Sequence, residues 1–409
     1  MVRLFRRLGA LVLAGALAAC AGILALRAAL PDTYCVAPGT AFAIASMPWL
    51  SAAGLTPETA AVGSVQRDTS RNCTLALFGV LPVKTVRTVS TARRTVRVCG
   101  VPFGIKMFSN GALVVAFSDL YTVLGSENPA KEAGLRLGDL IVSANGRAVR
   151  TNEELAAAIA AAGGGAVQIE YYRGGAPRTC ALTPAADRRT GAYKAGVWVR
   201  DSSAGIGTLT FVDPAGQTFA GLGHAISDSD TGAEIPLLSG EIVPVTVTGC
   251  VRGGAGAPGE LRGEFAGGKT WGRVLMNDAT GVYGAFCGTP AGTEWPVANA
   301  QEVQHGDALL QTTVSGAAPQ TYRILIERVN LNAADPNRNL LIRVTDPALL
   351  AATGGIVQGM SGSPILQNGR LVGAVTHVLV NDPARGYAIL AETMLDGADL
   401  CAQKMETTP

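Results

Sequence analysis

The sequence is poor in histidine, in aromatic residues and in charge of either sign. Only His224, His305 and His377 occur among 409 residues, aromatic residues make up 5% and charged residues 16%. Because 33 lysines and arginines nearly balance 31 aspartates and glutamates, the chain lacks the basic excess typical of nucleic-acid binding, and no nucleic-acid partner is expected. Any chemistry that needs an imidazole must use one of three residues.

The composition is that of a folded protein rich in turns. Hydrophobic residues make up 48% of the chain, which excludes a disordered, highly charged protein. The 51 glycines and 21 prolines follow no three-residue collagen period and indicate many short strands joined by tight turns. The length is sufficient for two or three units with separate cores.

An uncharged run from Leu8 to Leu26 follows Arg3, Arg6 and Arg7. At about 1.5 Å per residue, such a helix can cross a hydrocarbon core of roughly 30 Å. The basic flank places the N-terminus in the cytoplasm and the rest of the chain outside, so residues 1–30 are predicted to be a membrane anchor or signal segment. A cleaved signal peptide and a lipobox ending at Cys20 are alternatives, and all three predict export.

The cysteines show no close metal-ligand spacing, so we expect no metal and no other cofactor. Cys20 lies in the apolar run and leaves an odd number outside it. We interpret the others as small buried hydrophobes with one or two disulfides among them. They are Cys35, Cys73, Cys99, Cys180, Cys250, Cys287 and Cys401.

Residues 31–100 are polar and irregular, with short β-like pieces such as Thr74 to Phe78. Arg93, Arg94 and Arg97 form a small basic cluster at the end of this stretch. We interpret the stretch as a solvated linker or an accessory strand region.

Between residues 101 and 184 the pattern is sharper. Thr151 and Glu154 have the capping-box spacing at the start of a helix, and Asn145-Gly146 favours a two-residue hairpin turn. Together with Ala133-Gly134-Leu135 and Leu137-Gly138-Asp139-Leu140-Ile141, these elements resemble a bacterial PDZ domain.

PDZ domains bind an extended peptide as an added strand and offer backbone N–H groups to a terminal carboxylate. The resemblance places that loop at Phe103, Gly104 and Ile105, with the helix from Leu155 to Ile159 as the other wall of the groove. The expected partners are peptide C-termini or internal segments. The alternative is a groove covered by another domain or by the chain itself.

From residue 195 to 405 the chain consists of glycine-punctuated β-like pieces, which predict a barrel or sandwich. In the segment Gly359-Met360-Ser361-Gly362-Ser363-Pro364, glycines on both sides of Ser361 allow adjacent N–H groups to converge while the hydroxyl stays exposed. An acyl-transfer nucleophile needs this geometry, although a plain tight turn has the same composition.

His224 lies in a glycine-flanked loop ahead of this serine, His377 in a β-like segment, and His305 in a predicted turn. The residue chemistry leaves the acid open, although Asp228 and Asp230 are more typical of loop shaping. The aspartates between His224 and the serine are Asp228, Asp230, Asp278, Asp307, Asp335 and Asp346.

Three long strings then resemble the stage IV sporulation protein B family of serine peptidases. They are His224 to Gly232, Gly354 to Ile365, and Gly373 to Val378 followed by Val380-Asn381-Asp382-Pro383. The resemblance implies a mostly β chain with an N-terminal transmembrane helix, a PDZ domain and a chymotrypsin-like double β-barrel.

The resemblance also implies the site residues. Its order of histidine, aspartate and serine makes His224 the general base, Asp346 the acid and Ser361 the nucleophile, and it excludes His377, which follows the serine. The oxyanion donors would be the N–H groups of Gly359 and Ser361. Ser363 is the rival nucleophile, better interpreted as a turn residue, and Thr376 is a candidate for the substrate groove.

By the same resemblance, the protein is an exported, membrane-tethered serine endopeptidase of sporulation. It would act in the space between the forespore membranes, cut itself within residues 31–100, and cleave a regulator of an intramembrane metalloprotease, which activates a late transcription factor. Two alternatives are a general envelope quality-control protease and a catalytically inactive PDZ scaffold. Quality-control proteases usually carry Gly-Asn-Ser-Gly-Gly and place the PDZ domain after the protease.

Overall fold

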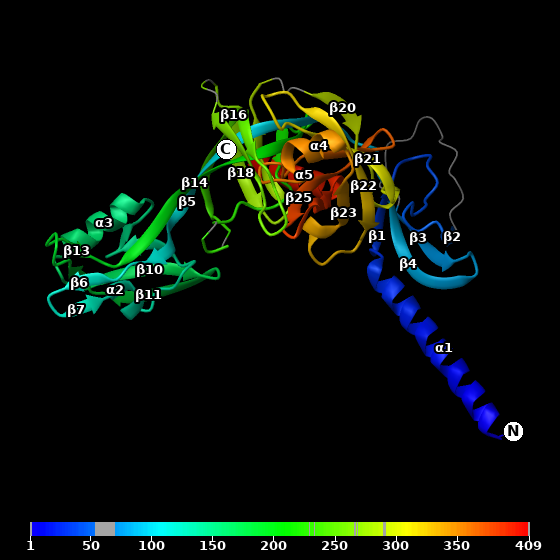
Figure 1. Cartoon of the computed structure of the whole chain (residues 1–409), viewed down its shortest axis with the longest axis horizontal. Helices are drawn as coiled ribbons and strands as arrows, with labels where there is room; N and C mark the ends of the chain where they lie inside the picture. Colours follow the sequence, from blue (N-terminus) through cyan, green and yellow to red (C-terminus); the bar gives the residue numbers. More distant parts are fainter. Residues whose placement is uncertain are drawn as a thin grey trace.

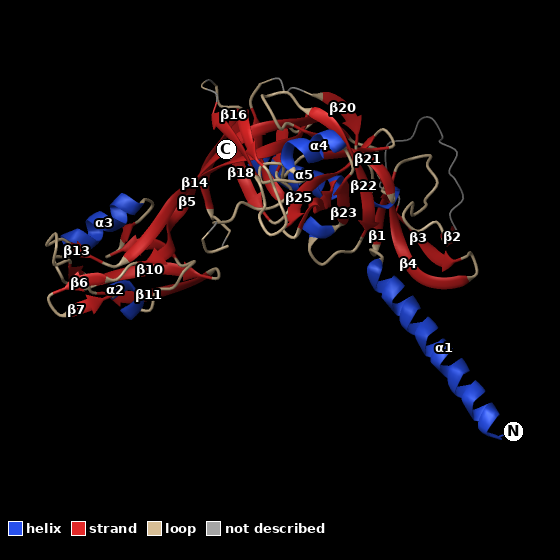
Figure 2. Ribbon diagram, viewed as in Figure 1, coloured by secondary structure: helices blue, strands red, loops and turns tan. Residues whose placement is uncertain are grey.

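The computed structural model describes residues 2–53, 70–228, 230–232, 234–265, 267, 269–288 and 292–407. Strands dominate this part of the chain, and helices are few (Figure 2). The mostly β fold predicted from the glycine and proline content is confirmed. All eight cysteines are free, so the expected one or two disulfides are absent. The prediction of buried cysteines holds for Cys73, Cys99 and Cys401, whereas Cys287 is exposed and the other three outside α1 are half-buried.

The N-terminal helix α1 (Val2–Ala29) projects away from the rest of the molecule (Figure 1). Its segment Leu11–Ala29 is long and apolar enough to cross a membrane; none of its residues is fully buried, and Leu26 near its end is half-buried against the core. The apolar helix expected from the sequence is therefore present, and its exposure suggests a signal anchor or membrane attachment.

Of the two alternatives predicted for residues 31–100, a solvated linker and an accessory strand region, the described part has the second, because most of it is folded. A four-stranded sheet has the order β1-β4-β3-β2, with β1 parallel to β4. Cys73, Leu75 and Val86 of this sheet join the same apolar core as the second barrel described below. Part of the stretch expected to contain a self-cleavage site, residues 54–69, lies outside the described residues. The strands are β1 (Thr33–Val36), β2 (Leu50–Ala53), β3 (Ser70–Leu77) and β4 (Leu81–Ser90).

The basic cluster at the end of this stretch joins the sheet to the barrels. Each of its three arginines is engaged by at least one carboxylate from a distant part of the chain. Because these ion pairs connect distant segments of the chain, the cluster has a structural role. The pairs are Arg93 with Glu302 (2.7 Å), Arg94 with Asp213 and Asp399, and Arg97 with Glu294 (3.1 Å).

Two six-stranded barrels form the centre of the molecule. The first closes because β5 pairs with both β14 and β16, in the cycle β5-β14-β15-β19-β18-β16. Its core includes Phe103 and Phe219, whose ring centroids are 6.4 Å apart. Its strands are β5 (Thr95–Phe117), β14 (Val197–Asp213), β15 (Thr218–Gly221), β16 (Leu237–Val251), β18 (Gly272–Asp278) and β19 (Gly281–Phe286).

The second barrel closes in the order β21-β22-β23-β26-β25-β24. Helix α5 (Ala391–Thr407) packs against strands of both barrels. The barrel strands are β21 (Gly306–Thr312), β22 (Gln320–Val329), β23 (Leu340–Val344), β24 (Pro364–Gln367), β25 (Arg370–Leu379) and β26 (Asp382–Leu390). Accessory elements are β17 (Glu260–Phe265), β20 (Thr293–Pro296), α4 (Pro347–Thr353) and the 3₁₀ turns Ala300–Glu302 and Pro336–Arg338.

A third unit with its own core forms the PDZ domain. The predicted capping box is present, with the Glu154 N–H donating to Thr151 Oγ1 at 3.2 Å. Asn145 and Gly146 both have positive φ, as the predicted hairpin turn requires. The elements are β6 (Leu120–Thr122), β7 (Gly125–Glu127), α2 (Pro129–Glu132), β8 (Leu140–Ala144), β9 (Arg147–Ala148), α3 (Asn152–Ala161), β10 (Val167–Arg173), β11 (Ala176–Leu182), β12 (Ala185–Ala186) and β13 (Tyr193–Lys194).

The PDZ domain is inserted in the first barrel and does not precede it. Strand β5 runs from the barrel into the PDZ core, and β14 returns antiparallel beside it, so the two form one long ribbon (Figure 1). The peptidase unit expected at residues 195–405 therefore includes β5, which begins at Thr95. Pairing with β14 on both sides of Ser109, Asn110 and Gly111 carries β5 past these residues into the PDZ core.

Candidate active site

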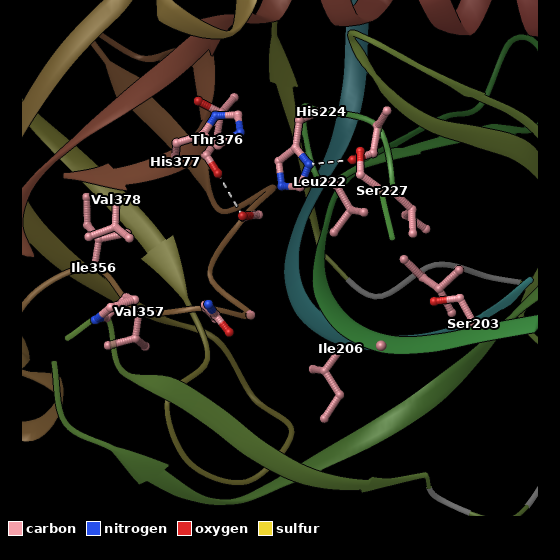
Figure 3. A pocket seen from close by; sticks show the side chains of 18 of the residues that line it. Ser203, Ile206, Leu222, His224, Ser227, Ile356, Val357, Thr376, His377 and Val378 are labelled. Carbon is pink, nitrogen blue, oxygen red and sulfur yellow. Dashed lines mark hydrogen bonds between the residues drawn. The ribbon is translucent and has the colours of Figure 1, made fainter. Parts of the chain in front are cut away.

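A cleft of about 520 Å³ lies between the two barrels. The first barrel contributes His224, from the loop that follows β15, and the second contributes Ser361, from the turn that precedes β24. Thr376 and His377 of β25 also line this cleft and face His224 (Figure 3). The fold therefore brings together the predicted base and the predicted nucleophile from positions far apart in the sequence.

His224 is half-buried and held in one tautomer. Its Nδ1 lies 2.8 Å from the Ala225 carbonyl oxygen. Because a carbonyl can only accept, Nδ1 carries the proton and Nε2 keeps its lone pair, as a general base requires. Burial lowers the pKa of His224 to about 4. The hydrogen bond to Ala225 raises this pKa and the neighbouring His377 lowers it further, but burial has the largest effect. The imidazole is therefore neutral near pH 7.

His377 is a site neighbour that chain order alone excluded from the triad. Its ring centroid lies 4.8 Å from that of His224, with the ring planes tilted by 35°. His377 is exposed at the mouth of the cleft, but partial desolvation by the surrounding protein lowers its pKa as well, so the pair is neutral near pH 7. The second imidazole thus packs against the predicted base, His224, and limits the access of water to one face of its ring.

Asn277, at the end of β18, anchors the histidine loop. Its Oδ1 accepts from the Ile226 N–H at 2.7 Å, and its Nδ2 donates to the carbonyls of Ile226 and Ile235, each at 3.1 Å. The sequence predicts no role for Asn277. No local signal identifies it, because only closure of the first barrel brings β18 beside the loop.

Ser361 rests in the cleft with its hydroxyl turned to a carbonyl. Its Oγ donates to the Thr376 backbone oxygen at 2.8 Å, and no hydrogen bond joins it to His224 in the described part of the chain. Rotation about one side-chain bond redirects a serine hydroxyl, and such hydrogen bonds often form only when substrate is bound. The Thr376 hydroxyl donates to the Asn337 carbonyl at 2.7 Å, so Thr376 presents its backbone to the nucleophile.

The N–H groups of Gly359 and Ser361 donate to no group in the described structure. The Gln358 carbonyl accepts from the Leu261 N–H at 2.8 Å, and the Met360 carbonyl accepts from the Ser363 N–H at 2.9 Å. The Gln358 carbonyl shares a peptide group with the Gly359 N–H, and the Met360 carbonyl shares one with the Ser361 N–H. In a trans peptide the N–H and the carbonyl point in opposite directions, so the N–H groups of Gly359 and Ser361 point away from Leu261 and Ser363. Since both residues line the cleft, these N–H groups have the placement that an oxyanion hole needs.

Strand β14 holds the nucleophile turn in place. The Thr208 N–H donates to the Ser361 carbonyl and the Thr208 hydroxyl to the Gly359 carbonyl, each at 2.9 Å. The Thr210 hydroxyl donates to the Gly362 carbonyl at 2.7 Å. Ser363 is fully buried and donates to Thr312 Oγ1 at 2.8 Å, a position that supports its interpretation as a turn residue.

The structure does not join Asp346 to His224. Asp346 caps helix α4, with Oδ1 accepting from the Ala348 N–H at 2.9 Å and Oδ2 from the Arg323 N–H at 3.1 Å. The Arg323 hydrogen bond is the main cause that lowers the pKa of Asp346, and the Ala348 bond contributes in the same direction. Its role as the acid of a triad stays a prediction.

Phe103, Gly104 and Ile105 lie in strand β5 of the first barrel, and so differ from the predicted PDZ loop. Phe103 is fully buried, and Ile105 lines the active-site cleft. The apolar, glycine-containing segment suggested a loop because strand pairing on both of its edges, with β14 and β16, is not visible in the sequence.

In the PDZ domain, the segment of β14 from Val197 to Asp201 pairs with β5 along one edge and has no strand on the other in the described chain. Helix α3 contacts β14. Val197 and Val199 are half-buried against the PDZ core, as are Ala158 and Ala162 at the end of α3, whereas Trp198 is exposed. This is the strand edge and helix pair that β-augmentation uses.

Two closed barrels, with a histidine from one and a serine from the other facing a shared cleft, define a serine endopeptidase. The sequence profile of the SpoIVB peptidase S55 family matches residues 191–395, half of the chain, and a PDZ domain profile matches residues 103–183. The chain belongs to the SpoIVB peptidase S55 family. A search of curated proteins finds no match to the sequence.

Several solved structures are similar to parts of the chain. The PDZ domain of the SdrC-like protein from Listeria monocytogenes is 24% identical and covers 22% of this chain and 87% of its own, with a TM-score of 0.19. The active form of the Rv3671c protease from M. tuberculosis is 16% identical over 49% of this chain and 74% of its own, with a TM-score of 0.30. An HtrA-type protease, AlgW with decapeptide, is 12% identical over 50% of this chain and 55% of its own, with a TM-score of 0.29.

Proposed function

We propose that Ser361 and His224 cleave peptide bonds by acyl transfer. Ser361 Oγ attacks the carbonyl carbon while His224 Nε2 takes the hydroxyl proton, and the N–H groups of Gly359 and Ser361 bind the resulting oxyanion. The imidazolium then gives its proton to the leaving amine. Water, deprotonated by the same histidine, hydrolyses the acyl-enzyme. The observation that supports this assignment is that the N–H groups of Gly359 and Ser361 line the cleft and donate to no acceptor in the described structure.

A fluorophosphonate probe tests the nucleophile directly. Its phosphorus forms a bond with an activated serine oxygen and loses fluoride, so we expect tryptic mass mapping to place the adduct on Ser361. Ser363→Ala is the matched control and is expected to label like the wild type, because the Ser363 hydroxyl lies inside the barrel. An adduct on another serine, or no adduct on folded protein, would contradict the assignment.

Asp346 is proposed as the acid of the triad by resemblance alone, and its contacts favour a different role. As the cap of α4, it supports the segment that leads to the nucleophile turn. Asparagine caps a helix about as well as aspartate, whereas alanine costs about 1 kcal/mol. From the contacts we expect Asp346→Asn to keep kcat within about tenfold of the wild type, and Asp346→Ala to be less stable to thermal unfolding.

The same pair of variants distinguishes the two roles. Loss of the acid from a catalytic triad lowers kcat by about 10⁴-fold. If Asp346→Asn loses that much activity while its melting temperature is unchanged, Asp346 acts on His224 through its charge. The measurement is kcat on fluorescein-labelled casein beside a thermal melt.

The substrate class we propose is an extended protein segment. The edge of β14 from Val197 to Asp201, beside α3, would bind such a segment as an added strand. The family match supports a protein substrate. By resemblance to the family, we also propose self-cleavage near the N-terminus, followed by cleavage of a regulator of an intramembrane metalloprotease during sporulation. The exposed apolar helix α1 supports a membrane-tethered enzyme, with the forespore intermembrane space as the proposed location.

Two alternatives have less support. An inactive PDZ scaffold does not require a cleft lined by His224, by Ser361 and by two N–H groups that have no hydrogen-bond acceptor in the described structure. A general quality-control protease of the envelope usually has its PDZ domain after the catalytic domain. Here the PDZ domain is inserted in the first barrel, between strands β5 and β14 that belong to both units.

A further inference from the structure

Strand β14 is shared by the PDZ domain and the catalytic unit. Its first residues belong to the PDZ core, and Thr208 and Thr210 further along hold the nucleophile turn. Between these two ends lie Arg200 and Asp201. The strand register shifts between Arg200 and Ser202, an irregularity of the kind that re-aims side chains.

Arg200 holds the loop that carries the catalytic histidine. Its guanidinium forms ion pairs with Asp228 and with Asp230, the second at 2.8 Å. The Asp228 carboxylate is fully buried, and its other oxygen accepts from the N–H groups of Asp230 and Thr231 at 3.1 and 3.0 Å. Asp228 therefore organises the backbone just after His224, and Arg200 is the cation that compensates its buried charge.

Asp201, the next residue, contacts the PDZ domain. Its Oδ2 accepts from the N–H of Asn152, the first residue of α3, at 2.8 Å. Neighbouring side chains in a strand point to opposite faces, so one residue reaches the histidine loop and the next reaches the helix. The carboxylate is also favourably placed at a helix N-terminus.

We propose that Arg200 and Asp201 are positioning residues that connect helix α3 of the PDZ domain to the His224 loop of the active site. This inference rests on the proposed function, because the peptide would lie between β14 and α3, the two elements that the Asp201 contact ties together. A bound segment that shifts α3 relative to β14 changes the position of Arg200, and with it the loop that holds the base. Substrate capture in the PDZ domain thereby sets the alignment of the catalytic histidine.

Arg200→Met tests the contact with the histidine loop. It keeps an apolar stem of similar length and removes the charge, so we expect kcat on labelled casein to fall by about 5- to 150-fold with little change in KM, the range of typical coupling between sites. The acid limb of kcat/KM should move to higher pH, because a looser loop exposes His224 to water. Arg200→Lys should recover part of kcat. Arg178→Met, on the exposed strand β11, is the matched control and should behave like the wild type.

Asn152→Pro tests the contact with the PDZ helix. Proline lacks the N–H that Asp201 accepts, yet it is favoured at the first position of a helix. The preceding Thr151 has φ −124° and ψ 163°, which a following proline tolerates. We expect the melting temperature to be retained and kcat to fall by about fivefold, the low end of that range. Asp201→Ala removes the same bond from the other side and should reproduce this fall.

The outcomes separate this inference from the proposed function. All variants are measured as full chains in detergent micelles, with fluorophosphonate labelling of the wild type as the reference. If the wild type does not label, the proposed function fails. If the wild type labels and cuts casein while Arg200→Met matches Arg178→Met in kcat, KM and acid limb, the positioning role of Arg200 is overturned. If only Asn152→Pro and Asp201→Ala match the wild type, the connection to α3 is overturned.

Discussion

Ser361→Ala is expected to lower kcat by about 10⁴- to 10⁶-fold, the loss seen when a serine peptidase keeps its oxyanion hole and substrate binding but has no nucleophile. The methyl group leaves the turn intact, because Thr208 bonds the backbone of Ser361 and not its side chain. The melting temperature should therefore change little. The measurement is casein cleavage, together with the mass of the mature N-terminus of both proteins.

The N-terminal mass tests self-cleavage in the same experiment. If the chain cuts itself, the wild type loses an N-terminal segment and Ser361→Ala keeps it. Ser363→Ala provides the control, with activity close to the wild type and a stability loss of about 1 kcal/mol for one buried hydrogen bond. A Ser361→Ala protein that still cut casein would exclude this residue as the nucleophile.

Gly362→Ala is expected to abolish activity and to destabilise the fold by more than about 4 kcal/mol, in the range that only severe mechanisms reach. A Cβ at this position would lie 2.1 Å from the Thr208 carbonyl oxygen and 2.6 Å from the Leu222 N. Both are backbone atoms that cannot move without displacing β14 or the histidine loop. The Gly362 φ of +92° adds strain for any side chain.

Gly369→Ala separates the two causes. Gly369 also has a positive φ, +72°, but its Cβ would meet nothing within 4 Å. We expect the free energy of unfolding of this control to fall by only about 1 to 2 kcal/mol, the cost of a left-handed backbone conformation, with kcat unchanged. The measurement is urea unfolding of both variants beside kcat. Equal destabilisation of the two would show that strain alone, and not the close approach of β14, fixes glycine beside the nucleophile.

The predictions that the structure confirms depend on short stretches of sequence. The capping box at Thr151 and the turn at Asn145 are set by neighbouring residues, and the structure has both. The predicted PDZ loop at Phe103 is different: its residues suit a loop or a strand equally, and partners more than a hundred residues away decide for the strand. The sequence left residues 31–100 open between a linker and an accessory strand region for a similar reason, because their short strands are stabilised by a core shared with the second barrel.

The scarcity of histidine limited the base to three residues, and the glycines around one serine indicated a candidate nucleophile, because both are recognised by residue type and local flexibility; the family resemblance then selected His224 and Ser361. Only the tertiary structure decided what surrounds them: the amide of Asn277, the ring of His377, and the N–H groups left undonated beside Ser361. It also decided that the PDZ domain lies inside the first barrel, with Arg200 and Asp201 between the two. These features arise from pairing between distant strands, and a sequence read locally contains no record of which strands meet.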